Sequence, residues 1–244
     1  MLTWSGSHIG RVRELNEDSY YIWCSGETGF FMVADGMGGH QAGEVASKLA
    51  IDTLRNYIET FCFDVPTTAN IDYSAIMQKG VQQCNRVIFQ QALTEPKYAG
   101  MGTTLTAAMV VKGNLFSAHV GDSRLYLFRQ GKLHLLTRDH SLVEEMVAEG
   151  LVTREEAQNH PRRHILTRAI GTDENVAVDT SVCALEPKDL LLLCTDGITS
   201  LINDGEITEV LKQNTVLCKQ GQALMDLANS RGGEDNITII LVQV

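Results

Sequence analysis

Apolar segments joined in pairs by short turns are the feature of this sequence that most constrains its fold. Three such pairs occur along the chain: residues 19–23 and 29–34 around "CSGET", 103–111 and 115–121 around "KGN", and 124–129 and 132–137 around "QG". Turns this short close β-hairpins, whereas a parallel pair needs a crossover of about a dozen residues or more. Three further apolar runs follow at 176–185, 189–195 and 236–244. The pattern predicts sheets built mostly from sequential antiparallel strands.

Amphipathic helices are expected in two pairs, set apart from the strands. Residues 41–61 and 73–93 form the first pair, because apolar side chains recur there at three- and four-residue spacing. These side chains are Val45, Leu49, Leu54, Tyr57, Ile58 and Phe61, then Ile76, Met77, Val81, Cys84, Val87 and Ile88. Residues 205–212 and 215–230 form the second pair, and 141–164 is interpreted as a surface insertion with short helical pieces. Helices separated from antiparallel strands predict a layered α+β domain.

The composition favours one globular domain in a reducing compartment. The 244 residues include only four prolines and no charge block that would mark a linker, so a single domain over residues 1–244 is expected. The formal net charge of −10 argues against nucleic-acid binding, which needs clustered cations. No apolar run is long enough to span a bilayer, and the N-terminus lacks the apolar stretch of a signal peptide, so no membrane association is expected. The six scattered cysteines argue against a zinc site or a disulfide framework and predict a cytoplasmic protein.

Aspartates stand at the strand boundaries, usually beside a glycine. Asp18 precedes one strand of the first hairpin and Asp35 follows the other, so antiparallel pairing puts both at the same end. Asp122 stands at the open end of the second hairpin. If the last two apolar runs pair antiparallel, Asp196 and Asp235 also share an end. A single Asp-Gly is most simply a turn, but converging carboxylates repel one another unless a cation lies between them.

This cluster predicts a divalent cation held by oxygen atoms. Carboxylates without His or Cys at metal-binding spacing favour Mg²⁺ or Mn²⁺ over zinc. A glycine beside a ligand lets a backbone carbonyl, such as that of Gly36, approach the ion. A structural calcium site is the alternative, although the closely spaced ligands of an EF-hand loop are absent. Ligands from distant segments suit a catalytic site.

Eight segments, in this order, carry a resemblance to a known family. They are "RELNED" (13–18), "ADGMGGH" (34–40), "GTT" (102–104), "GDSR" (121–124), "RDHS" (138–141), "TRAIG" (167–171), "CTDG" (194–197) and "GGEDNIT" (232–238). Together they resemble the PPM/PP2C family of metal-dependent protein serine/threonine phosphatases, in its bacterial form. The resemblance implies a four-layer α-β-β-α sandwich, in which two antiparallel sheets are flanked by helix pairs. It also implies that the insertion, at about 141–166, is a flap beside the catalytic cleft.

The resemblance implies a centre with two or three Mn²⁺ or Mg²⁺ ions. Asp35 resembles the carboxylate that bridges two metals, and Asp196 and Asp235 would complete the first metal site. The carbonyl of Gly36 and the carboxylate of Glu17 would hold the second metal.

Three further residues match the family's functional positions. Asp18 would be a direct or water-mediated ligand, and Asp122, with Asp196, resembles the ligand pair of a weaker third metal. Arg13 matches the phosphate-binding arginine, whose planar fork binds two oxygens at once. The implied mechanism is direct attack on phosphorus by a water that two metals share. No cysteine lies in a Cys-x₅-Arg phosphate loop, so a cysteine nucleophile is not supported.

One position departs from the animal members of the family. Met37 stands where those members carry a histidine that is proposed to protonate the leaving group. The nearest histidine is His40, whose place after a glycine-rich turn is typical of packing or capping, although histidine is the usual acid–base group. We hypothesise that a metal-bound water donates this proton.

Several neighbouring residues have simpler interpretations. Thr103 and Thr104 are interpreted as strand residues without chemistry. Asp139 and His140 are predicted to be a helix N-cap and its neighbour. Asn236 is expected to orient its loop rather than to bind metal.

Three functions are compatible with this sequence. The resemblance implies an active phosphatase that acts on phosphoserine and phosphothreonine proteins and opposes a serine/threonine kinase. A catalytically inactive signalling module of the same fold would usually lack a bridging carboxylate, and here the carboxylates are all present. A small-molecule phosphoesterase would differ in its flap and groove. The basic stretch "NHPRRH" (159–164) is either a solvated loop or a contact for phosphopeptide flanks through Arg162 and Arg163.

Overall fold

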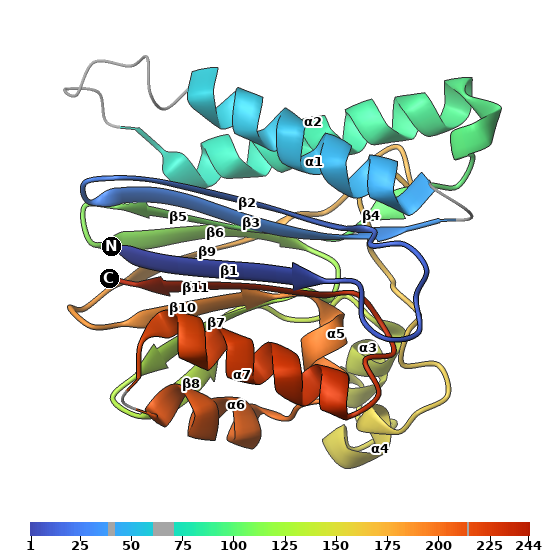
Figure 1. The fold of residues 1–244 in the computed structure, drawn as a ribbon. Helices are drawn as coiled ribbons and strands as arrows, with labels where there is room; N and C mark the ends of the chain where they lie inside the picture. Colours follow the sequence, from blue (N-terminus) through green and yellow to red (C-terminus); the bar gives the residue numbers. More distant parts are fainter. Residues whose placement is uncertain (39–41, 61–70, 214) are drawn as a thin grey trace.

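Two antiparallel sheets lie face to face, and a pair of helices covers the outer face of each (Figure 1). The structure, a computed structural model, describes residues 1–38, 42–60, 71–213 and 215–244. The first sheet has the order β2 (Asp18–Ser25), β3 (Thr28–Met37), β5 (Leu105–Val111), β6 (Asn114–Val120) and β9 (Asp179–Ala184), with β4 (Gly102–Thr103) paired to the end of β3. The second sheet has the order β1 (Leu2–His8), β11 (Ile237–Gln243), β10 (Leu190–Cys194), β7 (Arg124–Arg129) and β8 (Lys132–Leu135). The three predicted hairpins are confirmed, because β2 pairs with β3, β5 with β6, and β7 with β8.

The helices occupy the two outer layers. The first sheet is covered by α1 (Ala42–Ile58) and α2 (Tyr73–Thr94), and the second by α6 (Asp204–Lys212) and α7 (Leu217–Ser230) (Figure 1). Shorter helices are η2 (Pro96–Tyr98), α3 (Leu142–Ala148), α4 (Arg154–Gln158) and α5 (Asp196–Thr199). The predicted α+β class and the four-layer α-β-β-α sandwich are therefore confirmed.

The central strands β3, β5, β10 and β11 are buried on both faces, which explains their continuous apolar runs. On β3, Phe31 and Val33 point between the two sheets and pack with Leu191 of β10. The alternate residues Phe30 and Met32 point to the other side, into the layer formed with α1 and α2. A matching layer lies between the second sheet and the helices α6 and α7. Strands buried on both faces cannot alternate apolar with polar residues, so they are uniformly hydrophobic.

The buried stripe of α1 overlaps the predicted one only in part. Its centre is formed by Ala46, Ala50 and Leu54, which are fully buried, whereas the predicted Val45 and Leu49 are only half-buried. Small alanine side chains let α1 lie close to β3, and the larger side chains then flank the contact. The periodicity predicted the helix correctly, and Leu54 and Ile58 of the predicted stripe are fully buried, whereas Val45 and Leu49 are not.

The strand β1 was not predicted from the sequence. It forms the edge of the second sheet and pairs with β11, from Leu2 opposite Gln243 to His8 opposite Ile237. Serine and glycine interrupt its apolar pattern, so no periodic signal marks it. Trp4 lies against α7, where a Cβ atom on Gly221 would be only 2.0 Å from the indole ring. This strand exists because a tertiary neighbour supplies its hydrogen bonds and its packing surface.

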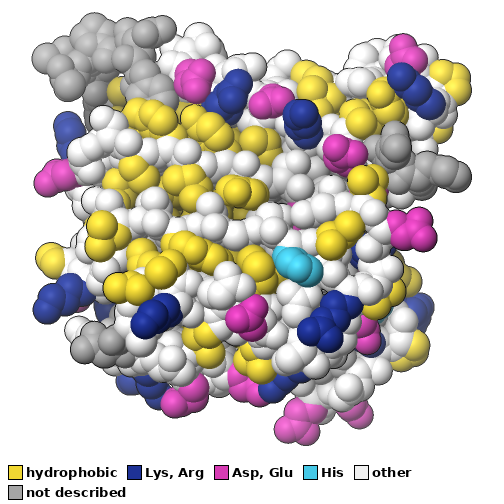
Figure 2. Space-filling model, in the orientation of Figure 1, with side chains coloured by type: hydrophobic (Ala, Val, Ile, Leu, Met, Phe, Trp, Pro, Cys, Tyr) yellow, Lys and Arg dark blue, Asp and Glu magenta, His cyan; other side chains and the backbone are white. Residues whose placement is uncertain are grey.

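The edge strands β1 and β2 lie along the face seen in Figure 1. Figure 2 shows bands of apolar side chains across the middle of this face and charged side chains mostly above and below them. Within the described parts of the chain, no helix has the length and hydrophobicity needed to cross a membrane.

Candidate active site

Strand pairing gathers the predicted aspartates at one end of the sandwich. Asp18 lies directly opposite Asp35 in the register of β2 and β3. Asp196 follows β10 and Asp235 precedes β11, and these strands are antiparallel neighbours, as predicted. Besides burial, the negative charges of four neighbouring aspartates raise the pKa of Asp35. In decreasing order of effect they are Asp18, Asp196, Asp122 and Asp235. The structure therefore brings all five aspartates together.

Asp35 is held by two threonines for which the sequence predicted no chemistry. Its backbone N–H donates to Thr104 Oγ1 at 2.9 Å, and its carbonyl accepts from Thr103 Oγ1 at 2.8 Å. Thr104 Oγ1 also shares a 2.8 Å hydrogen bond with Ser123 Oγ, next to Asp122 in the chain. Both threonines are buried, and Thr103 Oγ1 also lies 2.9 Å from the carbonyl oxygen of Thr104, so their hydroxyls bond only within the protein. The available signal was the pair of hydroxyls at the start of an otherwise apolar strand.

Buried oxygen atoms without partners mark the centre of the site. Asp18 Oδ2 accepts from Thr195 Oγ1 at 2.9 Å, but its Oδ1 has no hydrogen-bond partner. Asp196 Oδ1 and Glu17 Oε1 are also buried without a hydrogen-bond partner. Unpartnered buried oxygens are costly and call for a cation or a proton.

The electrostatics of the cluster point to the same need. Burial, followed by the neighbouring carboxylates, holds the pKa of Asp35 and that of Asp122 well above the ordinary range of an aspartate. The pKa of Asp196 is raised mainly by burial and by Asp235. Burial also raises the pKa of Glu17, although amides at the start of α1 lower it in part. In the absence of a cation, these groups therefore bind protons more readily than isolated carboxylates.

The donor set fits hard divalent cations. All the converging groups are oxygen donors, which suit Mg²⁺ and Mn²⁺. Among the described residues, no three His, Cys, Asp or Glu side chains stand as a ready-made metal site. The carboxylates line an end of the sandwich from separate elements. Gly36 permits this approach, because a Cβ atom there would be 2.1 Å from the carbonyl oxygen of Gly43 and 2.6 Å from that of Glu17.

Arg13 lies at the exposed rim of the cluster. Its Nη2 donates to Asp235 Oδ2 at 2.7 Å, and half of its side chain is exposed. Arg13 thus joins the segment before β2 to the segment before β11. The predicted phosphate-binding arginine is therefore at the site and already oriented by an ion pair.

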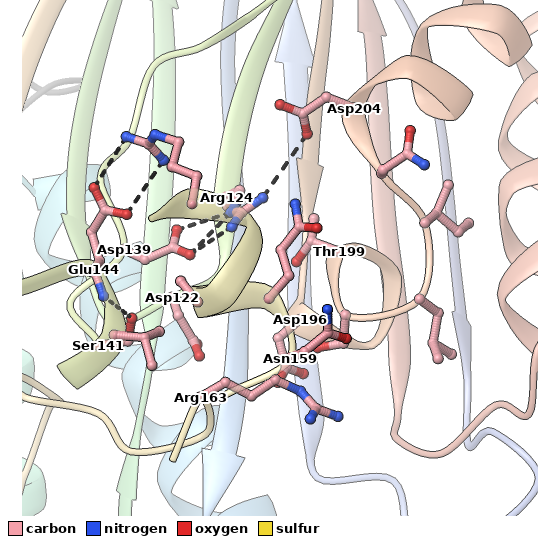
Figure 3. Close-up of a pocket in the computed structure, with 18 of the residues that line it drawn as sticks. Asp122, Arg124, Asp139, Ser141, Glu144, Asn159, Arg163, Asp196, Thr199 and Asp204 are labelled. Atoms are coloured by element: carbon pink, nitrogen blue, oxygen red, sulfur yellow. Dashed lines mark hydrogen bonds and ion pairs between the residues drawn. The ribbon is translucent and has the colours of Figure 1, made fainter. Parts of the chain in front are cut away.

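A cleft of about 580 Å³ extends from the aspartate cluster toward α6. One side consists of α3, α4 and the residues after them, and the other of α5 and the start of α6. Asp122 and Asp196 line one end of it together with Arg163 (Figure 3). Arg124 crosses the cleft wall, where its Nε and Nη2 donate to the carboxylate of Asp139 at 2.9 and 2.7 Å. The predicted insertion therefore forms one wall of a cleft that opens at the carboxylates.

The predicted helix N-cap lies two residues before the true one. Ser141, not Asp139, caps α3 by accepting from the backbone N–H of Glu144. Asp139 instead binds Arg124, and the buried His140 accepts from the Gly121 N–H through Nδ1 at 3.0 Å. The sequence could not separate these roles, because "DHS" offers two cap-forming side chains in three residues.

Two predicted positions cannot be assessed in this structure, because His40 and Phe61 lie outside the described residues. Met37 is the last residue of β3, opposite Gly102 of β4. The residue that replaces the animal histidine thus lies in a strand at the edge of the site.

Comparisons with known proteins agree with this geometry. A family model described as "Protein phosphatase 2C" matches residues 6–236. The serine/threonine phosphatase stp of Listeria innocua is 41% identical over 238 residues, which cover 96% of this chain and 92% of that protein. The solved S. agalactiae serine/threonine phosphatase has a TM-score of 0.90 and 38% identity, covering 100% of this chain and 99% of that one.

A further solved structure is the catalytic domain of the serine/threonine protein phosphatase PstP in complex with two manganese ions. It has a TM-score of 0.85 and 35% identity, and the match covers 99% of this chain and 97% of that one. Sequence and structure therefore match known phosphatases over nearly the whole chain. We conclude that the chain belongs to the protein phosphatase 2C family and is a serine/threonine phosphatase.

Proposed function

We propose that this phosphatase hydrolyses phosphoserine and phosphothreonine in proteins with the help of two or three Mn²⁺ or Mg²⁺ ions. The proposed ligands are Glu17, Asp18, Asp35, Gly36 (through its carbonyl), Asp122, Asp196 and Asp235. The observation that carries the proposal is the set of unpartnered buried oxygens of Glu17, Asp18 and Asp196 in one cluster. The manganese complex of PstP, a relative at 35% identity, supports the choice of ion.

The side chains of this cluster have different proposed roles in binding the ions. Asp35, at the centre of the charged groups, would bridge two ions, while Asp196 and Asp235 hold one of them and Glu17 and Gly36 the other. Asp18 would bind directly or through water. Bound divalent ions supply charge neutralisation at phosphorus and lower the pKa of the attacking water.

Arg13 and Asp122 have separate proposed roles. Arg13 would exchange part of its contact with Asp235 for two oxygens of the phosphoryl group, which its planar fork can bind together. Asp122, with Asp196, would hold a weaker third ion at the mouth of the cleft. We propose that water at the centre, and not His40, protonates the leaving group. If His40→Ala slowed substrates with poor leaving groups selectively and spared p-nitrophenyl phosphate, this proposal would be wrong.

Metal removal and restoration test the proposed function directly. Hydrolysis of p-nitrophenyl phosphate and of a phosphothreonine peptide is measured after chelation and again with Mn²⁺ or Mg²⁺ added. Asp35→Ala and Asp196→Ala are expected to abolish turnover, and Asp226→Ala, on the exposed face of α7, is the matched control. Activity on the aryl phosphate alone would favour a small-molecule phosphoesterase. No turnover with any metal, despite Mn²⁺ binding, would favour an inactive signalling module.

The flap offers a proposed contact for the substrate protein. Residues 141–166 form one side of the cleft, and Arg163 lines it near Asp196. Arg162 and Arg163 would then contact residues that flank the phosphorylated side chain. Replacing both with alanine should raise KM for phosphopeptides and leave KM for p-nitrophenyl phosphate unchanged.

The biological setting follows from the same reasoning. We propose a single phosphatase domain over residues 1–244, acting in the cytoplasm against a serine/threonine kinase. Scattered cysteines suit a reducing compartment. Fractionation of cells that produce the chain would test the location.

A further inference from the structure

The segment between β1 and β2 has no regular secondary structure, yet it carries two proposed functional residues. Residues 9–17 include Arg13 and Glu17 and form neither helix nor strand. A segment of this kind needs side-chain hydrogen bonds to hold its backbone in one place. Asn236 supplies three such bonds.

The side chain of Asn236 makes three hydrogen bonds, all to the backbone of residues 9–17. Its Nδ2 donates to the carbonyls of Ile9 at 2.9 Å and Leu15 at 3.0 Å, and its Oδ1 accepts from the Glu17 N–H at 2.8 Å. The side chain is 5% exposed, so water cannot replace these partners easily. Reversing the amide would put its NH₂ group against an N–H and its oxygen against two carbonyls. The amide orientation is therefore determined by its partners.

The backbone around Asn236 belongs to the other half of the site. Asn236 follows Asp235 directly, and a Cβ atom on Gly197, next to Asp196, would lie 1.9 Å from the Asn236 carbonyl oxygen. The 9–17 segment crosses the same backbone so closely that a Cβ atom on Gly10 would be 2.3 Å from the Asp235 carbonyl oxygen. One residue therefore touches the segments that carry Glu17, Asp196 and Asp235.

We propose that Asn236 is a positioning residue that sets the place of Arg13 and Glu17 relative to Asp235. This inference rests on the proposed function, because it assigns Asn236 a part in aligning the phosphate-binding and ion-binding groups. The side chain itself contacts neither substrate nor ion. It acts through the backbone of residues 9–17, and a side chain that lacks two donors and one acceptor cannot do the same.

The chain contains a matched control for this residue. Asn85 of α2 is 2% exposed and also makes three hydrogen bonds to backbone groups. Its Nδ2 donates to the carbonyls of Asp173 and Glu174, and its Oδ1 accepts from the Gly171 N–H. The residues that Asn85 holds include no proposed ligand. Asn85→Ala and Asn236→Ala therefore each remove three hydrogen bonds of the same kind, but from different segments of the backbone.

Amide hydrogen exchange in the metal-free protein tests the contact without reference to activity. Asn236→Ala is expected to speed exchange of the Glu17 amide by about tenfold or more, because that N–H loses its acceptor, and to speed exchange at other amides of residues 9–17, because their backbone loses two anchoring bonds. Asn85→Ala should speed exchange at 171–174 and leave 9–17 unchanged. In the unaltered protein, the Glu17 amide should be protected. An unprotected Glu17 amide would overturn the inference even if the Asn236 variant did not fold.

Kinetics at saturating Mn²⁺ test the positioning role. Asn236→Ala should raise KM for p-nitrophenyl phosphate by about tenfold, whereas Asn85→Ala should leave it unchanged. In an Arg13→Ala background, Asn236→Ala should raise KM by clearly less than in the unaltered background, because one of the two residues that it positions is gone. An equal rise in both backgrounds would overturn the inference. Failure of the proposed function would appear differently, as the absence of metal-dependent turnover in the unaltered protein.

Discussion

Replacing Asp18 with asparagine is expected to stabilise the metal-free protein at neutral and alkaline pH while it damages catalysis. Asp18 lies opposite Asp35 in the β2–β3 register, and its Oδ1 is buried without a partner. Asparagine has the same shape but no charge, and its NH₂ group can donate to the carboxylates that surround it. The change therefore removes the charge and supplies a donor in one step.

The magnitude follows from the proton equilibrium of this side chain. Burial raises the pKa of Asp18 from its ordinary value of 3.8 to about 7, against the opposing effect of hydrogen bonds from Thr238 and Thr195. Because the folded state binds this proton more tightly than the unfolded chain, the stabilising effect is full below pH 3.8 and is lost as the pH rises to 7. Each unit of pKa difference corresponds to about 1.36 kcal/mol, so the loss is about 4 kcal/mol. The variant has no such loss.

Urea unfolding in the presence of a chelator, measured between pH 4 and pH 8, provides the assay. The free energy of unfolding of Asp18→Asn should match that of the unaltered protein near pH 4 and exceed it by about 4 kcal/mol at pH 8. Asp226→Asn, on the exposed face of α7, is the control and should show no pH-dependent difference. A stability difference that did not change with pH, or a variant less stable at pH 8, would refute the reasoning. Mn²⁺ should stabilise the unaltered protein more than the variant.

Three further predictions test other parts of the structure. Thr104→Val should lower the free energy of unfolding by about 1–3 kcal/mol, because the Asp35 N–H loses its acceptor, and urea melts should show Thr104→Ser to be milder. Arg13→Lys should raise KM for p-nitrophenyl phosphate by about tenfold through loss of the planar fork, and steady-state kinetics with an unchanged KM would contradict that role. Leu54→Ala, in the fully buried layer between α1 and the sheet, should cost about 2–5 kcal/mol in urea unfolding, whereas Leu93→Ala, at a side chain that is 66% exposed, should change stability by less than about 0.5 kcal/mol.

The hairpins and long helices could be predicted from sequence because their signals are local. A short turn between apolar runs determines an antiparallel pair without knowledge of the rest of the chain. The helices α2, α6 and α7 were located from the sequence within two residues of their observed ends. The strand β1 was missed, since its partner β11 lies more than 200 residues away along the chain.

The candidate site divides in the same way. Asp18 and Asp35, and likewise Asp196 and Asp235, could be paired from sequence because each pair stands at the ends of neighbouring antiparallel strands. That both pairs meet at one place depends on how the two sheets pack, and no local pattern encodes that packing. Before the structure, only the family resemblance implied that the two pairs of aspartates form one site.

The side chains that hold the site were the least predictable. Thr104 and Asn236 have no distinctive spacing, and each acts on a residue far away in the chain, at separations of 69 and 219 residues. From the sequence, Thr104 was interpreted as an ordinary strand residue, and only a loop-orienting role was expected for Asn236. Their partners become visible only when the backbone groups of Asp35 and Glu17 are placed in space.

The sequence by itself determined most of the elements, the antiparallel pairing of the hairpins and the end of each strand at which the aspartates stand, because these depend on turns and on periodicity within about ten to twenty residues. The tertiary structure alone decided that the two sheets bring their carboxylates together, that β1 closes the second sheet, and which buried hydroxyls and amides hold the site. Those outcomes depend on long-range packing and on the need to satisfy every buried polar group. Both conditions apply to the folded chain as a whole and to no single segment of it.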